Sequence, residues 1–284
     1  MGTREDIFFW ISEKQSSDVS WLWYPYIPYG KICVLQGDPG CGKSMLMTDI
    51  IAKLTSGKML PDGKRHEPIN VIYQCSEDGI EDTIKPRLEK AGADCSKVAC
   101  IDEDLVTLTL NDDKIEQAIK ASLAKLIVID PFQAYVGDSD LSNVTGMRRI
   151  MRQLGTWASN YNCAVVMVGH LNKKSGQKEL YRGLGSVDII ASARSVIQVE
   201  RIEDNPRLRI MRHVKSSLSS PGESLIFEIS EDGSFRWIPN ETYEAARQRH
   251  FKEIYSEDEN AHSKIITAGH IMLQMLAEGP VAAA

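Results

Sequence analysis

The chain has 284 residues and a formal net charge of -6 at pH 7, with 43% hydrophobic and 25% charged residues. This composition is typical of a globular protein with a large core, and the acidic balance argues against a chain coated nonspecifically with nucleic acid. Since no run reaches the roughly 20 apolar residues that span a bilayer, and the polar start differs from a secretory signal, we expect a cytoplasmic location and no membrane partner.

A glycine-rich loop lies between a predicted strand, Ile32–Gln36, and a predicted helix, Met45–Leu54. The loop reads Gly37, Asp38, Pro39, Gly40, Cys41, Gly42, Lys43, Ser44. Glycines let successive backbone N–H groups point inward, and the following helix adds the positive end of its dipole. The pattern predicts that the loop and Met45 bind a nucleoside triphosphate, with Lys43 at the β- and γ-phosphates and the Ser44 hydroxyl on Mg²⁺. The alternative is a chance glycine-rich turn, which the order of strand, loop and helix disfavours.

The next predicted strand, Asn70–Gln74, runs into two carboxylates, Glu77 and Asp78. Hydrolysis of a triphosphate needs a base that orients water in line with the γ-phosphate. We expect Glu77 to be this base, with Asp78 as its competitor. The alternative is that both carboxylates cap the predicted helix Ile80–Ala91, since acidic side chains suit a first helical turn.

Two further predicted strands, Val98–Ile101 and Leu126–Ile129, flank a predicted helix, Asp113–Ala124. The second strand delivers Asp130 to the carboxyl edge of the sheet, where ligands bind in open parallel sheets. We therefore predict that Asp130 holds Mg²⁺ together with Ser44. An acidic residue that merely ends a strand is the alternative.

A long predicted helix, Val144–Tyr161, precedes the strand Ala164–Val168, which runs on into Gly169 and His170. Because His170 should lie near the γ-phosphate, we expect it to sense the phosphate and relay its loss to the next loop. The alternative is a structural, hydrogen-bonding histidine. The next loop is basic and carries Lys173, Lys174 and Lys178.

The pattern changes from Val196 onward. Short predicted strands follow one another at Val196–Arg201, Arg207–His213, Ser224–Ile229 and Phe235–Trp237, joined by turns. They predict antiparallel strands that extend one edge of a mainly parallel sheet, so the fold class is α/β. We predict one domain over 1–240, with an N-terminal segment at 1–30, and a helical tail at 241–284 with helices at Glu241–Glu259 and Lys264–Leu276.

The order of these motifs resembles that of the RecA-like ATPases, and among them the RepA-type hexameric replicative helicases and related plasmid and phage ATPases. The residues that carry the resemblance, over about residues 20–240, are Trp23–Pro28, Gly30–Lys31, Gly37–Ser44, Ser76–Gly79, Ile129–Pro131, Gly169–Lys173 and Tyr181–Ser186. It implies a RecA-like sheet between helices, with ATP and Mg²⁺ as cofactors. The aromatic run 21–29 is expected to pack against the domain or a neighbouring subunit.

The resemblance also implies residue roles. Glu77 would be the catalytic base, Asp130 the Mg²⁺-associated carboxylate and His170 the phosphate sensor. Arg87 would stack its planar guanidinium on adenine. Arg194 would be a finger that crosses to the γ-phosphate of a neighbouring subunit, the alternative being a surface arginine.

In this family nucleic acid threads the central channel of a ring, so the partners implied are single-stranded DNA and a homo-oligomer, a hexameric ring. Lys173, Lys174 and Lys178 would contact DNA phosphates, and Arg182 would serve either DNA or the active site. The function implied is Mg²⁺-dependent ATP hydrolysis coupled to translocation along DNA or to unwinding, in replication of a plasmid, phage or mobile element. The tail from Ile265 to Pro280 resembles the start of a winged-helix extension.

Two alternatives to a helicase remain open. One is a recombinase-like or regulatory ATPase that acts on DNA without unwinding it. The other is a nucleotide-dependent switch whose ligand is a protein.

Overall fold

The computed structural model describes residues 9–137, 144–170, 187–202 and 205–240. The chain divides into two units, Met1–Trp237 and Ile238–Ala284. Nearly all of the second unit, including the helices predicted at Glu241–Glu259 and Lys264–Leu276, lies outside the described residues.

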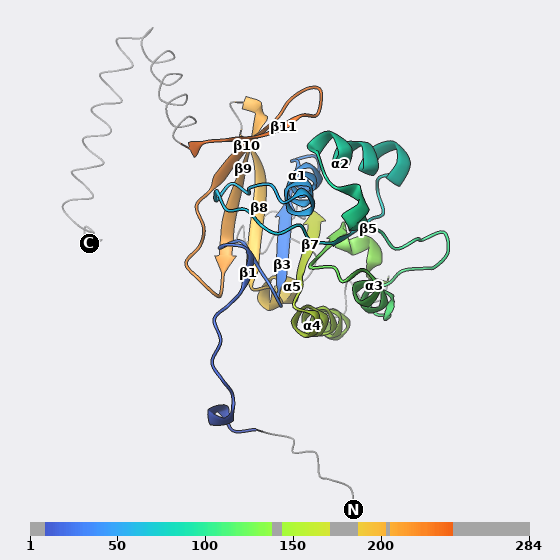
Figure 1. Cartoon of the computed structure of the whole chain (residues 1–284), viewed down its shortest axis with the longest axis vertical. Coiled ribbons are helices and arrows are strands. Elements are labelled where there is room, and N and C mark those ends of the chain that lie inside the picture. The colour runs from blue at the N-terminus through green and yellow to red at the C-terminus, as the bar shows by residue number, and fades with distance from the viewer. Residues whose placement is uncertain (1–8, 138–143, 171–186, 203–204, 241–284) are drawn as a thin grey trace, which may run out of the picture. The chain divides into compact units, whose positions relative to one another are not determined.

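The first unit is built on one sheet of nine strands in the order β11-β10-β9-β8-β3-β7-β6-β4-β5 (Figure 1). The strands are β3 (Ile32–Gly37), β4 (Val71–Cys75), β5 (Val98–Ala99), β6 (Leu126–Asp130), β7 (Ala164–His170), β8 (Ser195–Ile202), β9 (Asn205–Ser216), β10 (Leu225–Ile229) and β11 (Phe235–Ile238). The strands from β8 to β5 run parallel, whereas β9 is antiparallel to β8 and β10 to β9. The predicted α/β class with an antiparallel edge is therefore confirmed, and it is consistent with a RecA-like fold.

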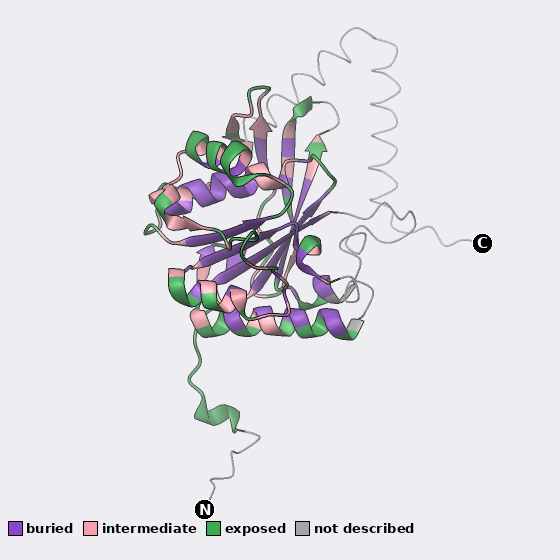
Figure 2. Ribbon diagram, turned by 90° about the vertical axis from the view of Figure 1, so that its right-hand side faces the viewer, coloured by how far each residue is buried: buried purple, intermediate pink, exposed green. Residues whose placement is uncertain are grey.

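Helices cover both faces of this sheet, and Figure 2 shows the buried strands between them. They are α1 (Lys43–Ser56), α2 (Lys85–Ala91), α3 (Lys114–Ser122), α4 (Val144–Tyr161) and α5 (Val187–Ser192). Because successive strand residues point to opposite faces, Cys33 and Leu35 pack in the cluster with α1, while Ile32 and Val34 pack in the cluster with α3, α4 and α5. Both clusters are continuous, which gives a sheet buried on its two sides.

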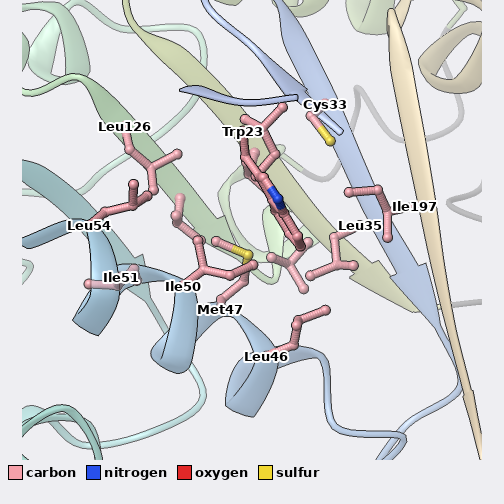
Figure 3. Packing of buried hydrophobic residues seen from close by; sticks show 14 of the residues in the cluster. Trp23, Cys33, Leu35, Leu46, Met47, Ile50, Ile51, Leu54, Leu126 and Ile197 are labelled. Atoms are coloured by element: carbon pink, nitrogen blue, oxygen red, sulfur yellow. The ribbon is translucent and has the colours of Figure 1, made fainter. Parts of the chain in front are cut away.

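α1 begins after Gly42 and ends before Gly57, and both glycines adopt the left-handed conformation. Figure 3 shows Leu46, Met47 and Ile50 of this helix turned toward β3 and toward Trp23. Trp23 has no exposed surface and Tyr26 is 4% exposed, so the aromatic run packs against the domain itself.

Some elements differ from the sequence expectation. The predicted helix 80–91 begins as a π-helical turn, Ile80–Ile84, before α2. The aromatic run contains a two-stranded antiparallel ribbon, β1 (Trp21–Trp23) and β2 (Ile27–Pro28), which was not predicted. The helix α5 was not predicted either, and β5 has two residues where four were expected. Single-turn 3-10 helices occur at Ile11–Glu13, Cys95–Lys97 and Phe132–Tyr135.

A buried histidine ties the aromatic ribbon to the sheet. The His213 Nδ1 atom accepts a hydrogen bond from the Gly222 N–H at 2.9 Å, so Nε2 carries the proton and donates to Ser195 Oγ at 3.0 Å. Ser195 Oγ in turn donates to the Tyr26 carbonyl at 2.6 Å. Burial lowers the pKa of His213, because the charged ring would be desolvated. A protonated ring would also lose the bond from Gly222.

We expect this histidine to make stability fall at acidic pH. Since the folded-state pKa lies below the unfolded value of about 6.5, the stabilisation is present above that pH and is lost as pH falls below it. Urea unfolding of wild type and His213→Gln at about pH 7.5 and about pH 5.5 measures the effect. Each unit of difference between the folded and unfolded pKa contributes at most about 1.4 kcal/mol to the free energy of unfolding. Wild type should lose more stability between the two pH values than the variant does. An equal loss in both proteins would contradict a neutral buried His213.

Candidate nucleotide-binding site

The glycine-rich loop connects β3 to α1, as the sequence predicts, and two of its glycines are required by space. Gly42 has a φ of +100°, and a Cβ atom there would lie 2.6 Å from Ile229 Cδ1. A Cβ atom at Gly37 would lie 2.4 Å from the Val199 carbonyl oxygen. Glycine therefore suits both positions, Gly42 through its left-handed conformation and Gly37 through its close approach to β8.

Lys43 opens α1 and points back into the loop. It is 4% exposed, and its ammonium group donates to the carbonyl oxygens of Gly37 at 2.9 Å and Asp38 at 3.0 Å. Its Nζ atom also lies 3.2 Å from Nδ1 of His170. The positive end of the helix dipole disfavours a cation at the start of α1, and the two loop carbonyls hold the Lys43 ammonium there. The ammonium and the dipole together favour the binding of an anion at this place.

Asp130 is the last residue of β6 and is 4% exposed. Burial raises its pKa, while hydrogen bonds from Ser44 and Tyr73 and the charge of Lys43 act in the opposite direction. The Tyr73 hydroxyl donates to its Oδ2 atom at 3.3 Å. Ser44 and Asp130 are thus neighbours, as the spacing predicts.

The Ser44 hydroxyl and the Asp130 carboxylate suit magnesium better than a metal ion that is bound by several protein side chains. Within the described ranges, no group of three or more His, Cys, Asp or Glu residues is placed to hold a metal ion. One hydroxyl and one carboxylate suit Mg²⁺, because this ion keeps several waters and takes its remaining oxygens from a substrate phosphate.

Glu77 and His170 complete the polar cluster at the carboxyl edge of the sheet. His170 ends β7 opposite Gly37 of β3, and its Nε2 atom lies 3.5 Å from Oε1 of Glu77. Since the Lys43 ammonium only donates, Nδ1 of His170 accepts, and Nε2 carries the proton that faces Glu77. Asp78, the competing carboxylate, instead accepts a hydrogen bond from Nη1 of Arg87 at 2.6 Å.

A cavity of about 420 Å³ lies beside the first turns of α1. It is lined by Met45, Thr48, Asp49, Lys53, Lys58, Arg87, Lys90, Ala91, Gly233, Ser234 and Phe235. The structure thus brings Met45 and Arg87, both predicted to bind the nucleotide, to one cavity of ordinary ligand size. The sequence did not predict that Gly233–Phe235 would form one wall of this cavity. The turn residues Asp232 and Gly233, between two short predicted strands, were the only local sign of a loop there.

Arg194 lies at the amino end of the parallel strands, opposite the carboxyl end where the polar cluster lies. Its N–H donates to the carbonyl of Ile32, where β3 begins, whereas the phosphate loop starts at Gly37, where β3 ends. Five strand steps separate the two edges by about 16 Å. The exposed Arg194 is therefore remote from the phosphate loop of its own chain.

The remaining predicted residues, Lys173, Lys174, Lys178 and Arg182, lie outside the described residues. In the part of the chain that the structure describes, no helix is both long and apolar enough to cross a membrane.

Residues 5–176 match the family model described as AAA domain. The chain is similar to DNA repair protein RadA of Halalkalibacterium halodurans, with 28% identity over 211 residues, 72% of this chain and 40% of the relative. It is also similar to DNA repair protein RadA of Brucella abortus, with 26% identity over 218 residues, 74% of this chain and 42% of the relative. The same protein of Bacillus subtilis is 24% identical over 208 residues, with shares of 72% and 40%. The chain thus spans about two fifths of the length of these relatives.

Proposed function

Because this chain belongs to the AAA domain family, whose model matches residues 5–176, we propose that it hydrolyses ATP with Mg²⁺ and couples the cycle to single-stranded DNA. The observation that carries the proposal is the convergence of Lys43, Ser44, Glu77, Asp130 and His170 at one edge of the sheet. These are the groups that phosphoryl transfer to water requires: a phosphate cradle, a metal site and a base.

Each residue then has a role in hydrolysis. The loop N–H groups and Lys43 would bind and orient the triphosphate. Ser44 and Asp130 would hold Mg²⁺, which would neutralise negative charge on the phosphates. Glu77 orients the attacking water and takes its proton. His170 loses a contact when Lys43 turns from it to the phosphates, so it can report the occupancy of the site to the residues that follow it.

We place the nucleoside in the cavity beside α1. Met45 and Arg87 line it, and the guanidinium of Arg87 offers a flat face on which adenine can stack. Phe235 lines the same cavity and adds an aromatic surface.

DNA is proposed as the partner because the similar proteins are named DNA repair protein RadA. Lys173, Lys174, Lys178 and Arg182 would contact the phosphates of a single strand. An arginine finger at Arg194 would need a neighbouring subunit, and we propose a hexameric ring in the cytoplasm that translocates along DNA or unwinds it during replication. We propose further that 1–240 forms the ATPase domain and 241–284 a helical tail that begins a winged-helix extension.

ATP hydrolysis with and without single-stranded DNA tests the proposal. Stimulation by DNA over a range of salt concentrations is expected. A rate that never responds to DNA would favour the switch whose ligand is a protein. The recombinase-like alternative is equally compatible with relatives named for DNA repair, and strand displacement on a forked duplex separates it from a helicase.

We expect Lys173→Ala combined with Lys174→Ala to weaken DNA binding. Loss of two phosphate contacts should reduce the slope of log affinity against log salt by about 1.4. Binding of a labelled oligonucleotide at several salt concentrations measures this slope. The matched control replaces two other lysines by Ala, Lys120 of α3 and Lys125, which directly precedes β6, and should leave the slope unchanged. Equal slopes in wild type and in the Lys173 and Lys174 variant would contradict the DNA assignment.

A further inference from the structure

A buried tyrosine follows the strand that ends in Asp130. Tyr135 ends the 3-10 helix that follows β6, and it is 2% exposed. Its hydroxyl donates to Oε1 of Glu103 at 2.8 Å. The same oxygen accepts a hydrogen bond from Nε2 of Gln74 at 2.5 Å. Three segments that are distant in sequence therefore meet at one carboxylate.

Gln74 explains why β5 is shorter than the sequence suggests. Its side-chain oxygen accepts from the Ile101 N–H at 2.9 Å, and its amide nitrogen donates to the Ile101 carbonyl at 3.3 Å. The side chain thus replaces the backbone pair that would have continued the ladder from β4 to β5. This arrangement fixes Gln74 near the end of β4, three residues before Glu77.

The end of β4 is also tied to Asp130, because the Ser76 N–H donates to the Asp130 carbonyl at 3.3 Å. Burial and the bond to Glu103 raise the pKa of Tyr135, while the nearby side chains of Gln74 and Ser76 oppose the rise. Ser76 directly precedes Glu77, and Asp130 lies five residues before Tyr135.

Glu77 itself depends on its backbone for its direction. Its side chain is 60% exposed, and its contact with His170 is 3.5 Å long. A side chain held so loosely points where its loop directs it. That loop is anchored at Gln74 through Glu103 and Tyr135, and at Ser76 through the bond to the Asp130 carbonyl.

We propose that Tyr135 is a positioning residue, which with Glu103 as acceptor fixes the loop of Glu77 relative to Asp130 and so aims the base. This inference rests on the proposed role of Glu77 in ATP hydrolysis. Catalysis is sensitive to such aiming, because displacement of a reacting group by about 1 Å can reduce a rate by about 100-fold.

Tyr135→Phe tests the proposal, with Tyr161→Phe as the matched control. The Tyr161 hydroxyl also donates to a carboxylate, Glu116, at 2.5 Å, but it lies at the end of α4, before β7 begins. Both variants lose one tyrosine–carboxylate bond, so similar changes in melting temperature are expected. Tyr135→Phe should lower kcat by about tenfold with KM for ATP changed less than about twofold, and Tyr161→Phe should change neither.

Glu103 provides the second test. Glu103→Ala should reproduce the loss in kcat, while Glu103→Gln, which keeps an acceptor oxygen, should restore most of it. The double variant of Tyr135→Phe and Glu103→Ala should be no slower than either single variant, because the two residues act as one unit.

Hydrogen exchange of the amides at 75–79 gives a readout that does not depend on hydrolysis. Faster exchange in Tyr135→Phe than in wild type and Tyr161→Phe is expected. Unchanged exchange, or a kcat that falls together with KM, would overturn the positioning role. If wild type failed to hydrolyse ATP but the exchange difference appeared, the proposed function would be wrong while the anchoring of the loop by Tyr135 would stand.

Discussion

Replacement of Glu77 by Gln is expected to lower kcat for ATP hydrolysis by about 10² to 10⁴, the usual contribution of a positioned base. Glutamine keeps the shape of the side chain and can still accept a hydrogen bond from Nε2 of His170, but it cannot take a proton from water. ATP should still bind, because the phosphate loop and Lys43 are unchanged. Steady-state kinetics and titration with a fluorescent ATP analogue measure the two effects separately.

Asp78→Asn is the matched control for this experiment. Asp78 neighbours Glu77 in sequence, but its carboxylate is engaged by Arg87 at 2.6 Å, and both side chains are partly exposed. An ion pair of this kind is worth about 1 kcal/mol or less, so a loss in kcat of no more than about fivefold is expected. A large loss in Asp78→Asn together with a small one in Glu77→Gln would transfer the role of base to Asp78.

Arg194→Ala is expected to lower the rate of the assembled protein by about 10³ to 10⁵, the effect of an arginine finger. Arg194 lies at the edge of the sheet opposite the phosphate loop of its own chain, so a contact with a γ-phosphate requires a second copy. Hydrolysis by the assembled variant, compared with wild type and Arg207→Ala, measures the loss. Arg207 is exposed on β9 and pairs with Glu231, so its removal should have little effect.

A mixing experiment tests whether Arg194 acts across a subunit boundary. Glu77→Gln subunits keep Arg194, and Arg194→Ala subunits keep Glu77, so a shared site between them has both groups. Random assembly of equal amounts should restore activity at about a quarter of the sites. A mixture as inactive as its components, or a protein that stays monomeric with nucleotide at every concentration, would rule out the finger.

The phosphate loop and the ends of the parallel strands were predictable from the sequence. The loop Gly37–Ser44 is recognisable in the sequence because all the groups of a phosphate-binding loop lie within eight consecutive residues. Asp130 and His170 follow apolar runs, and parallel strands bring their carboxyl ends to one edge whatever their order in the sheet. The distances between Lys43, His170 and Glu77 agree with that expectation of proximity.

The cavity wall and the cluster of Gln74, Glu103 and Tyr135 were not predictable in this way. Gly233–Phe235 lines a cavity together with residues of α1 and α2 because the strands β9, β10 and β11 continue the sheet beyond β8. Gln74, Glu103 and Tyr135 are ordinary residues in sequence, with no motif that joins them. They meet because β4 lies between β5 and β6, an order that no local pattern encodes.

The sequence by itself therefore determined the fold class and the groups available for phosphate chemistry, because strand periodicity and the glycine loop are local properties of the chain. Tertiary structure alone decided that Gln74, Glu103 and Tyr135 meet, and at which end of the strands Arg194 lies. Those features depend on the order of strands across the sheet, which is set by the packing of its two faces against α1 on one side and α3, α4 and α5 on the other.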